Sequence, residues 1–110
     1  MSIIYSPKTR GELKSFIENH SNYLIIVKAY AEWCQPCAMI SEYVIKKFNR
    51  IPVEKKILIQ LNVDEHKDAS NGLKIRALPT LISFREGMKQ DIVEGISKDK
   101  LEYFFENCYK

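Results

Sequence analysis

Cys34 and Cys37 are the residues of this 110-residue chain best suited to covalent chemistry, and they belong to the stretch Ala31-Glu32-Trp33-Cys34-Gln35-Pro36-Cys37. Two thiols three positions apart lie about one helical turn from each other, so a disulfide between them can form and open. The same spacing also supplies half of a zinc site. The surrounding sequence therefore has to decide between redox and metal chemistry.

Pro36 favours redox chemistry because of where it places the start of a helix. Proline is accepted in the first turn of a helix, since its missing N–H would have no partner there. We therefore expect the helix to begin around Cys34 to Pro36. Unpaired backbone N–H groups and the positive end of the helix dipole favour the thiolate of Cys34. Cys34 is then the attacking thiol, and Cys37 resolves the mixed disulfide.

Metal binding is not expected, because the chain contains no second C-x-x-C and no H-x-x-x-H motif. We expect no cofactor other than the redox-active pair Cys34 and Cys37. Trp33, beside the attacking thiol, offers a flat amphipathic surface to a partner chain. The alternative for Trp33 is a ring that only covers the edge of the core.

Length and composition predict one domain over residues 1–110, with 45 % hydrophobic and 28 % charged residues. The net charge of +3 is too small, and the lysines too scattered, for nucleic-acid binding. No apolar run is long enough to span a membrane, and the first residues do not resemble a signal peptide. Three cysteines, an odd number, do not fit a secreted disulfide scaffold. We expect a cytoplasmic monomer.

Hydrophobic periodicity along the chain predicts the strands and helices that position the cysteines. Strands are expected over residues 3–5, 23–30, 57–63, 80–84 and 90–93, and helices over residues 9–19, from about 34 to before Pro52, over 64–72, and after Ser97. Gly87 should take a positive φ in the turn between the last two strands. The closing hairpin is antiparallel, and the earlier β-α-β units require a parallel core. The expected fold is α/β, a central mixed sheet with helices on both faces.

One side chain within these elements can be interpreted in two ways. Cys108 falls on the apolar face of the last helix, where it is either a small core residue or a regulatory thiol.

Cys34 follows the central strand over residues 23–30. It should therefore lie at the carboxyl end of that strand, where open α/β sheets commonly place their sites.

Several motifs in order and spacing make the chain resemble the thioredoxin family. They are Ala-Glu-Trp-Cys-x-Pro-Cys at 31–37, Leu-Asn-Val-Asp at 61–64, Ile-Arg-Ala-Leu-Pro-Thr at 75–80, and the turn at 84–87. The resemblance implies the thioredoxin fold and a disulfide oxidoreductase acting on protein disulfides. It also implies a cis peptide bond before Pro79, which lies against the cysteines. Trp33, Leu78 and the stretch around Gly95 are implied to form the groove that holds an extended substrate segment.

The chain departs from the family pattern at Lys28, where thioredoxins usually carry a buried aspartate. A neutral lysine could act as a base, a protonated one would stabilise a thiolate, and a lysine that reaches solvent would do neither. Gln35 replaces the usual glycine, and the pair Gln35-Pro36 is implied to tune the redox poise. Glu42 replaces a helix-kinking proline, so we expect the helix after the cysteines to be straighter.

The first hypothesis for function is a protein-disulfide reductase that uses a reversible disulfide between Cys34 and Cys37. A thioredoxin reductase or another dithiol donor would restore the reduced pair. The second hypothesis is an oxidase or isomerase with a less reducing couple, motivated by the altered surroundings of Cys37. The third is a binding module that docks partners on Trp33, Leu78 and Pro79 without using the thiols.

Overall fold

The strands of the sheet follow the order β1-β3-β2-β4-β5 in the computed structural model, which describes residues 2–109. β1 and β2 run parallel to β3, whereas β4 is antiparallel to β2 and β5 is antiparallel to β4. In chain order the elements are β1 (Ser2–Tyr5), α1 (Arg10–Asn19), β2 (Leu24–Tyr30), α2 (Gln35–Met39), α3 (Ser41–Arg50), β3 (Lys56–Asn62), α4 (Lys67–Gly72), β4 (Thr80–Arg85), β5 (Met88–Glu94) and α5 (Lys98–Asn107). The expected mixed sheet is confirmed.

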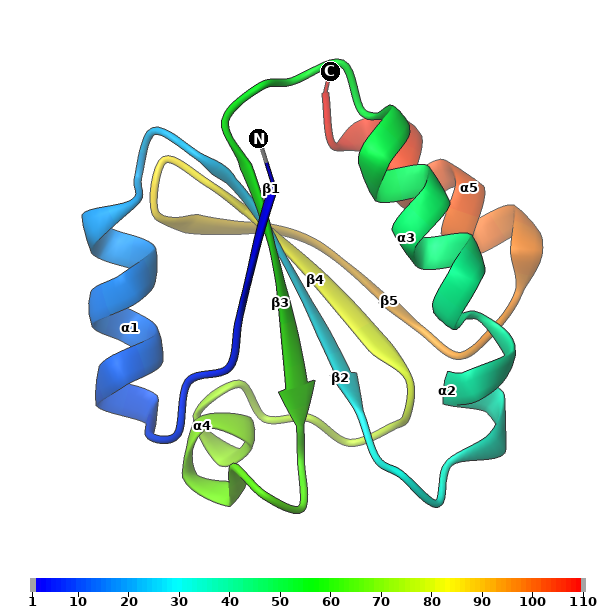
Figure 1. Cartoon of the computed structure of the whole chain (residues 1–110), viewed down its shortest axis with the longest axis horizontal. Helices are drawn as coiled ribbons and strands as arrows, with labels where there is room; N and C mark the ends of the chain where they lie inside the picture. Colours follow the sequence, from blue (N-terminus) through cyan, green and yellow to red (C-terminus); the bar gives the residue numbers. More distant parts are fainter. Residues whose placement is uncertain (1, 110) are drawn as a thin grey trace.

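Helices cover both faces of the sheet, with α1 and α4 on one side and α3 and α5 on the other (Figure 1). Side chains alternate along β2, as the pleat of a strand requires. Ile25 and Val27 pack with α1 and α4. Leu24 and Ile26 pack with α3 and α5 on the opposite face. The two faces of the central strand are therefore both buried, which is why its sequence is an almost uninterrupted apolar run.

The closing hairpin turns through Glu86 and Gly87, whose φ angles are 55° and 77°. Two consecutive positive φ angles are those of the two-residue turn that matches the twist of antiparallel strands. Gly95, with φ at 87°, ends β5. Ser97 precedes α5 at the N-cap position, but its side chain makes no capping hydrogen bond. In the described part of the chain, no helix has the length and apolar character needed to cross a membrane.

The helix after the cysteines is broken, and the expectation of one straighter helix is wrong. α2 ends at Met39, and α3 begins at Ser41. Between them Ile40 has φ −103° and ψ 3°, and its N–H bonds to the carbonyl only two residues back. The hydroxyl of Ser41 donates to the carbonyl of Cys37 at 3.2 Å. A serine that bonds four residues back tends to bend a helix, so a proline is not needed for the break.

Candidate active site

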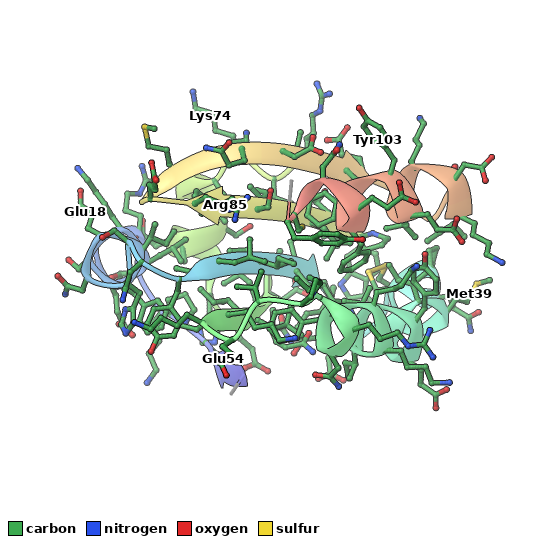
Figure 2. The ribbon with its side chains drawn as sticks, turned by 90° about the horizontal axis from the view of Figure 1, so that it is seen from above. Glu18, Met39, Glu54, Lys74, Arg85 and Tyr103 are labelled. Atoms are coloured by element: carbon green, nitrogen blue, oxygen red, sulfur yellow. A yellow bond between two sulfur atoms is a disulfide. The ribbon has the colours of Figure 1, made fainter. Side chains whose placement is uncertain are left out.

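The central strand β2 carries the chain to the cysteine pair at its carboxyl end. Cys34 is the N-cap of α2, and Gln35 and Pro36 form the first turn of that helix. Cys34 and Cys37 are joined by a disulfide, and their Cα atoms are 5.3 Å apart. Figure 2 shows this disulfide as a yellow bond inside the molecule, whereas the labelled side chain of Met39, further along α2, points outward.

The sulfur of Cys34 accepts a hydrogen bond from the backbone N–H of Cys37 at 3.2 Å. This N–H is one of the donors at the start of a helix that have no partner within the helix. A hydrogen bond to the charged form of a group favours that form. When the disulfide is open, the same donor would therefore stabilise a thiolate on Cys34 rather than on Cys37.

The peptide bond between Leu78 and Pro79 is cis. The carbonyl of Pro79 accepts a hydrogen bond from the N–H of Gly95 at 2.9 Å, which ties the segment before β4 to the end of β5. The hydroxyl of Thr80 donates to the carbonyl of Ala77 at 2.7 Å and closes the loop on its other side. The loop that carries Leu78 is thus fixed at both ends by hydrogen bonds.

An open cavity of about 610 Å³ lies beside the disulfide and brings together residues far apart in sequence. It is lined by Trp33, Cys34, Gln35, Pro36, Val63, Ser70, Ile75, Arg76, Ala77 and Leu78. Cys34 is 6 % exposed and lines the cavity, whereas Cys37 is 2 % exposed and is not among the lining residues. Gly95 is not among them either; it contacts the site through Pro79. The cavity therefore offers the sulfur of Cys34 to an incoming group.

Two exposed side chains at the cavity are held by acidic partners. Trp33 is 69 % exposed, and its indole N–H donates to Oδ2 of Asp64 at 2.8 Å. Arg76 makes two hydrogen bonds to the carboxylate of Glu94, at 3.0 and 3.3 Å. This contact raises the pKa of Arg76 and lowers that of Glu94. Asp64 stands in the family-like motif of the sequence, but nothing in the sequence alone pairs it with Trp33.

Lys28 is buried on β2 rather than extended to solvent. Its side chain belongs to the face of β2 that packs against α3 and α5, and the residue is only 3 % exposed. The amine Nζ donates to the hydroxyl of Ser41 at 3.1 Å and lies 5.7 Å from the ring centroid of Tyr30. Burial lowers the pKa of the Lys28 ammonium. The interpretation in which Lys28 reaches the surface is therefore wrong.

Ser41 is the residue near the cysteines that the sequence reasoning missed. Its hydroxyl accepts from Lys28 and donates to the carbonyl of Cys37, so it connects the buried amine to the cysteine pair. A signal was present in the sequence, because a serine four residues after Cys37 on a helix can bond back to its carbonyl.

The third thiol is structural. Cys108 is 2 % exposed, its sulfur donates to the carbonyl of Phe104 at 3.3 Å, and burial raises the pKa of its thiol to about 12. The core interpretation of Cys108 is confirmed. Within residues 2–109, no group of three or more His, Cys, Asp or Glu side chains is arranged to hold a metal ion.

Comparison with known proteins gives a consistent family. Residues 5–107 match the family model of thioredoxin. Thioredoxin H2 of Arabidopsis thaliana is 31 % identical over 101 residues, 89 % of this chain and 72 % of that protein. Thioredoxin-like protein 1 of Schizosaccharomyces pombe is 33 % identical over 82 residues, 74 % of this chain but only 28 % of that protein. The crystal structure of Fasciola hepatica thioredoxin superposes with a TM-score of 0.81 at 26 % identity, covering 96 % of this chain and 98 % of that one.

Proposed function

The chain belongs to the thioredoxin family, and we propose that Cys34 is the attacking thiol and Cys37 the resolving thiol of its protein-disulfide reductase activity. The family and the disulfide identify a thiol-disulfide oxidoreductase. The observation that carries the two roles is the unequal placement of the sulfurs. Cys34 lines the open cavity and receives the Cys37 N–H, while Cys37 lies behind it.

The electrons of the reaction come from the two thiols and pass to the substrate disulfide. The thiolate of Cys34 attacks one sulfur of the substrate, and the other substrate sulfur leaves as a thiolate. Cys37 then loses its proton and attacks Cys34 Sγ. The bond between Cys34 and the substrate breaks, and the second substrate sulfur leaves with the electron pair. The protein is left with the Cys34–Cys37 disulfide, and the substrate disulfide has gained two electrons.

The substrate is proposed to lie in the cavity as an extended segment of a disulfide-containing protein. Trp33 and Leu78 would contact it, because both line the cavity and Trp33 is exposed. Gly95 would contribute by holding Pro79, whose carbonyl it binds. Gln35 and Pro36 stand between the cysteines and are proposed to tune the redox poise, as is the buried Lys28.

The reduced pair is proposed to be restored by a thioredoxin reductase or another dithiol donor, in a cytoplasmic location. We further propose that the chain acts as a single domain and a monomer. This is supported by the position of both sulfurs and the cavity on one chain.

Trapping of the mixed disulfide tests the two roles. The Cys37→Ser variant should accumulate a covalent adduct with a disulfide-containing protein, linked through Cys34 and visible by intact mass spectrometry. Cys34→Ser should form none, and Cys108→Ser should turn over like the wild type. An adduct located on Cys37 in the Cys34→Ser variant, formed as fast as on Cys34, would contradict the assignment.

A further inference from the structure

The structure contains two buried lysines with very different surroundings. The Nζ of Lys56 donates to three carbonyl oxygens, those of Phe48, Asn49 and Ile51, at 2.9, 3.1 and 2.9 Å. An ammonium group has three N–H donors, so the site of Lys56 satisfies a charged amine. The Nζ of Lys28 has one hydrogen-bond acceptor within residues 2–109, the hydroxyl of Ser41. Apart from the Tyr30 ring, 5.7 Å from Nζ, these surroundings therefore leave two N–H donors of an ammonium without an acceptor.

The residues that the structure places next to Lys28 on the neighbouring strands, on its own strand and on α3 are neutral. On β3 its register partner is Gln60, and on β4 it is Leu81. From its own strand the ring of Tyr30 lies 5.7 Å from Nζ, a cation–π distance, and from the start of α3 comes the hydroxyl of Ser41. Neither the ion pair of Arg10 with Asp68 nor that of Arg76 with Glu94 involves Lys28. A buried cation without a counterion is costly, and such a lysine gives up its proton instead.

The amine is linked to the backbone of the resolving cysteine through one hydroxyl. Ser41 Oγ lies 3.1 Å from Lys28 Nζ and 3.2 Å from the carbonyl oxygen of Cys37, so one hydroxyl separates the amine from Cys37. The hydrogen bond from Ser41 to the Cys37 carbonyl spans the break between α2 and α3. It fixes the Ser41 hydroxyl, and with it the Lys28 amine, relative to Cys37. The position of β2 that faces Ser41 carries the amine of Lys28 and not a carboxylate.

We propose that Lys28, positioned by Ser41, takes the proton of the Cys37 thiol in the resolving step, in the place where thioredoxins usually have a carboxylate. This inference rests on the proposed function. The neutral amine accepts the proton and becomes an ammonium, and the Cys37 thiolate attacks Cys34 Sγ. The Cys34–Cys37 bond forms, the bond from Cys34 to the substrate sulfur breaks, and that sulfur leaves as a thiolate. The ammonium then returns its proton to this thiolate or to water.

A two-phase experiment separates this inference from the proposed function. Reduced protein is mixed with excess of an aromatic disulfide whose thiol product is coloured, and release is followed by stopped flow. Attack by Cys34 releases the first equivalent, and resolution by Cys37 releases the second. Lys28→Met should leave the first phase unchanged and slow the second at neutral pH by about tenfold or more, since general acid–base catalysis contributes at least that much. Lys46→Met, an exposed lysine on α3, is the matched control.

The pH profile and conservative variants distinguish proton transfer from packing. The rate of the second phase in Lys28→Met should rise steeply with pH, because hydroxide or water replaces the amine as the base. The rate in the wild type should change less. Lys28→Glu should recover part of the rate. Ser41→Ala should slow the second phase and shift its pH profile, and Ser41→Thr, which keeps the hydroxyl, should restore both. A second phase in Lys28→Met with the rate and pH profile of the wild type would overturn the proposal. A wild type without the first phase would instead contradict the proposed function.

Direct titration of Lys28 gives a second test that does not depend on the variants folding. The Nζ and Cε resonances of Lys28 are followed by NMR against pH in the oxidised and reduced protein, with Lys46 as reference. In the oxidised form we expect the pKa of Lys28 to lie below the ordinary range of a lysine, because the amine is buried. On reduction it should shift upward, when a thiolate lies near. An ordinary lysine titration for Lys28 in both forms would overturn the proposal.

Discussion

The backbone N–H of Cys37 lies 3.2 Å from the sulfur of Cys34 and donates to it. The contact makes the two cysteines chemically unequal although they share one disulfide. Cys34 has a donor that favours its thiolate and a place on the cavity wall. Cys37 has neither of these features. Its carbonyl accepts a hydrogen bond from the hydroxyl of Ser41, which in turn accepts one from the buried amine of Lys28.

The first prediction concerns the order in which the three thiols react. After reduction, iodoacetamide at neutral pH should modify Cys34 first, because its sulfur is accessible and its thiolate is stabilised. Cys108 should not react in the folded protein, since burial raises the pKa of its thiol to about 12. Peptide mass spectrometry measures each rate. Modification of Cys108 in the native state as fast as Cys34 would be inconsistent with this order, and unfolding in urea should abolish the difference.

The second prediction concerns the hydrogen bond from Trp33 to Asp64. Asp64→Ala leaves the indole N–H without its partner and frees the ring to rotate. We expect the KM for a protein disulfide to rise about fivefold, equivalent to about 1 kcal/mol. The rate of Cys34 alkylation should not change, because the thiol is untouched. Asp99→Ala on α5 is the control, and an equal KM for the two variants would show that Asp64 does not position Trp33.

The third prediction is a pH dependence of stability at Asp68. The carboxylate accepts from the Arg10 backbone N–H at 2.8 Å and from Arg10 Nε at 3.1 Å, and these contacts lower the pKa of Asp68. Because the folded pKa lies below the unfolded value of about 3.9, the stabilisation is present above that pH and is lost as pH falls through the folded pKa. Asp68→Asn should therefore be less stable than the wild type near neutral pH.

Urea unfolding at a series of pH values tests the prediction for Asp68. The difference in unfolding free energy between the wild type and Asp68→Asn should shrink as the solution becomes more acidic than about pH 4. A difference that stays constant across the range would mean that the carboxylate charge does not stabilise the contact between α1 and α4.

The fourth prediction concerns Lys56, whose amine binds three carbonyls at the end of α3. Lys56→Met leaves these buried acceptors without a donor and removes a positive charge from the helix C-terminus. We expect a loss of about 2 kcal/mol in the free energy of unfolding, measured by chemical denaturation. The neighbouring Lys55→Met, at an exposed position, should cost little. Equal stability of the two variants would argue against this role.

The elements that follow from local patterns could be predicted from the sequence. The side chain of Thr9 accepts from the Glu12 N–H, as the Thr-x-x-Glu spacing indicates for the start of α1. The apolar run of β2 predicted a central strand because both of its faces are buried. The cis bond at Pro79 is different. Its prediction came from the resemblance, since nothing local in the sequence distinguishes cis from trans there.

What the sequence could not provide depends on contacts between elements. The break at Ile40 arises from the bond of Ser41 to the Cys37 carbonyl, whereas helical periodicity continues across it. The burial of Lys28 depends on the helices that cover β2, so a lysine that reaches solvent was equally consistent with the sequence. The pairing of Trp33 with Asp64 joins residues 31 positions apart in the chain. Such contacts require the fold.

The equilibrium redox potential of the Cys34–Cys37 pair tests the central claim most directly. The pure protein is titrated against glutathione buffers, and free thiols at the two positions are counted by mass spectrometry, with Cys34→Ser as the blank. A reductase of protein disulfides predicts a potential near that of thioredoxin, about −270 mV. A value between about −180 and −120 mV would mean that the disulfide form is the working oxidant, and would contradict the proposed direction of the reaction.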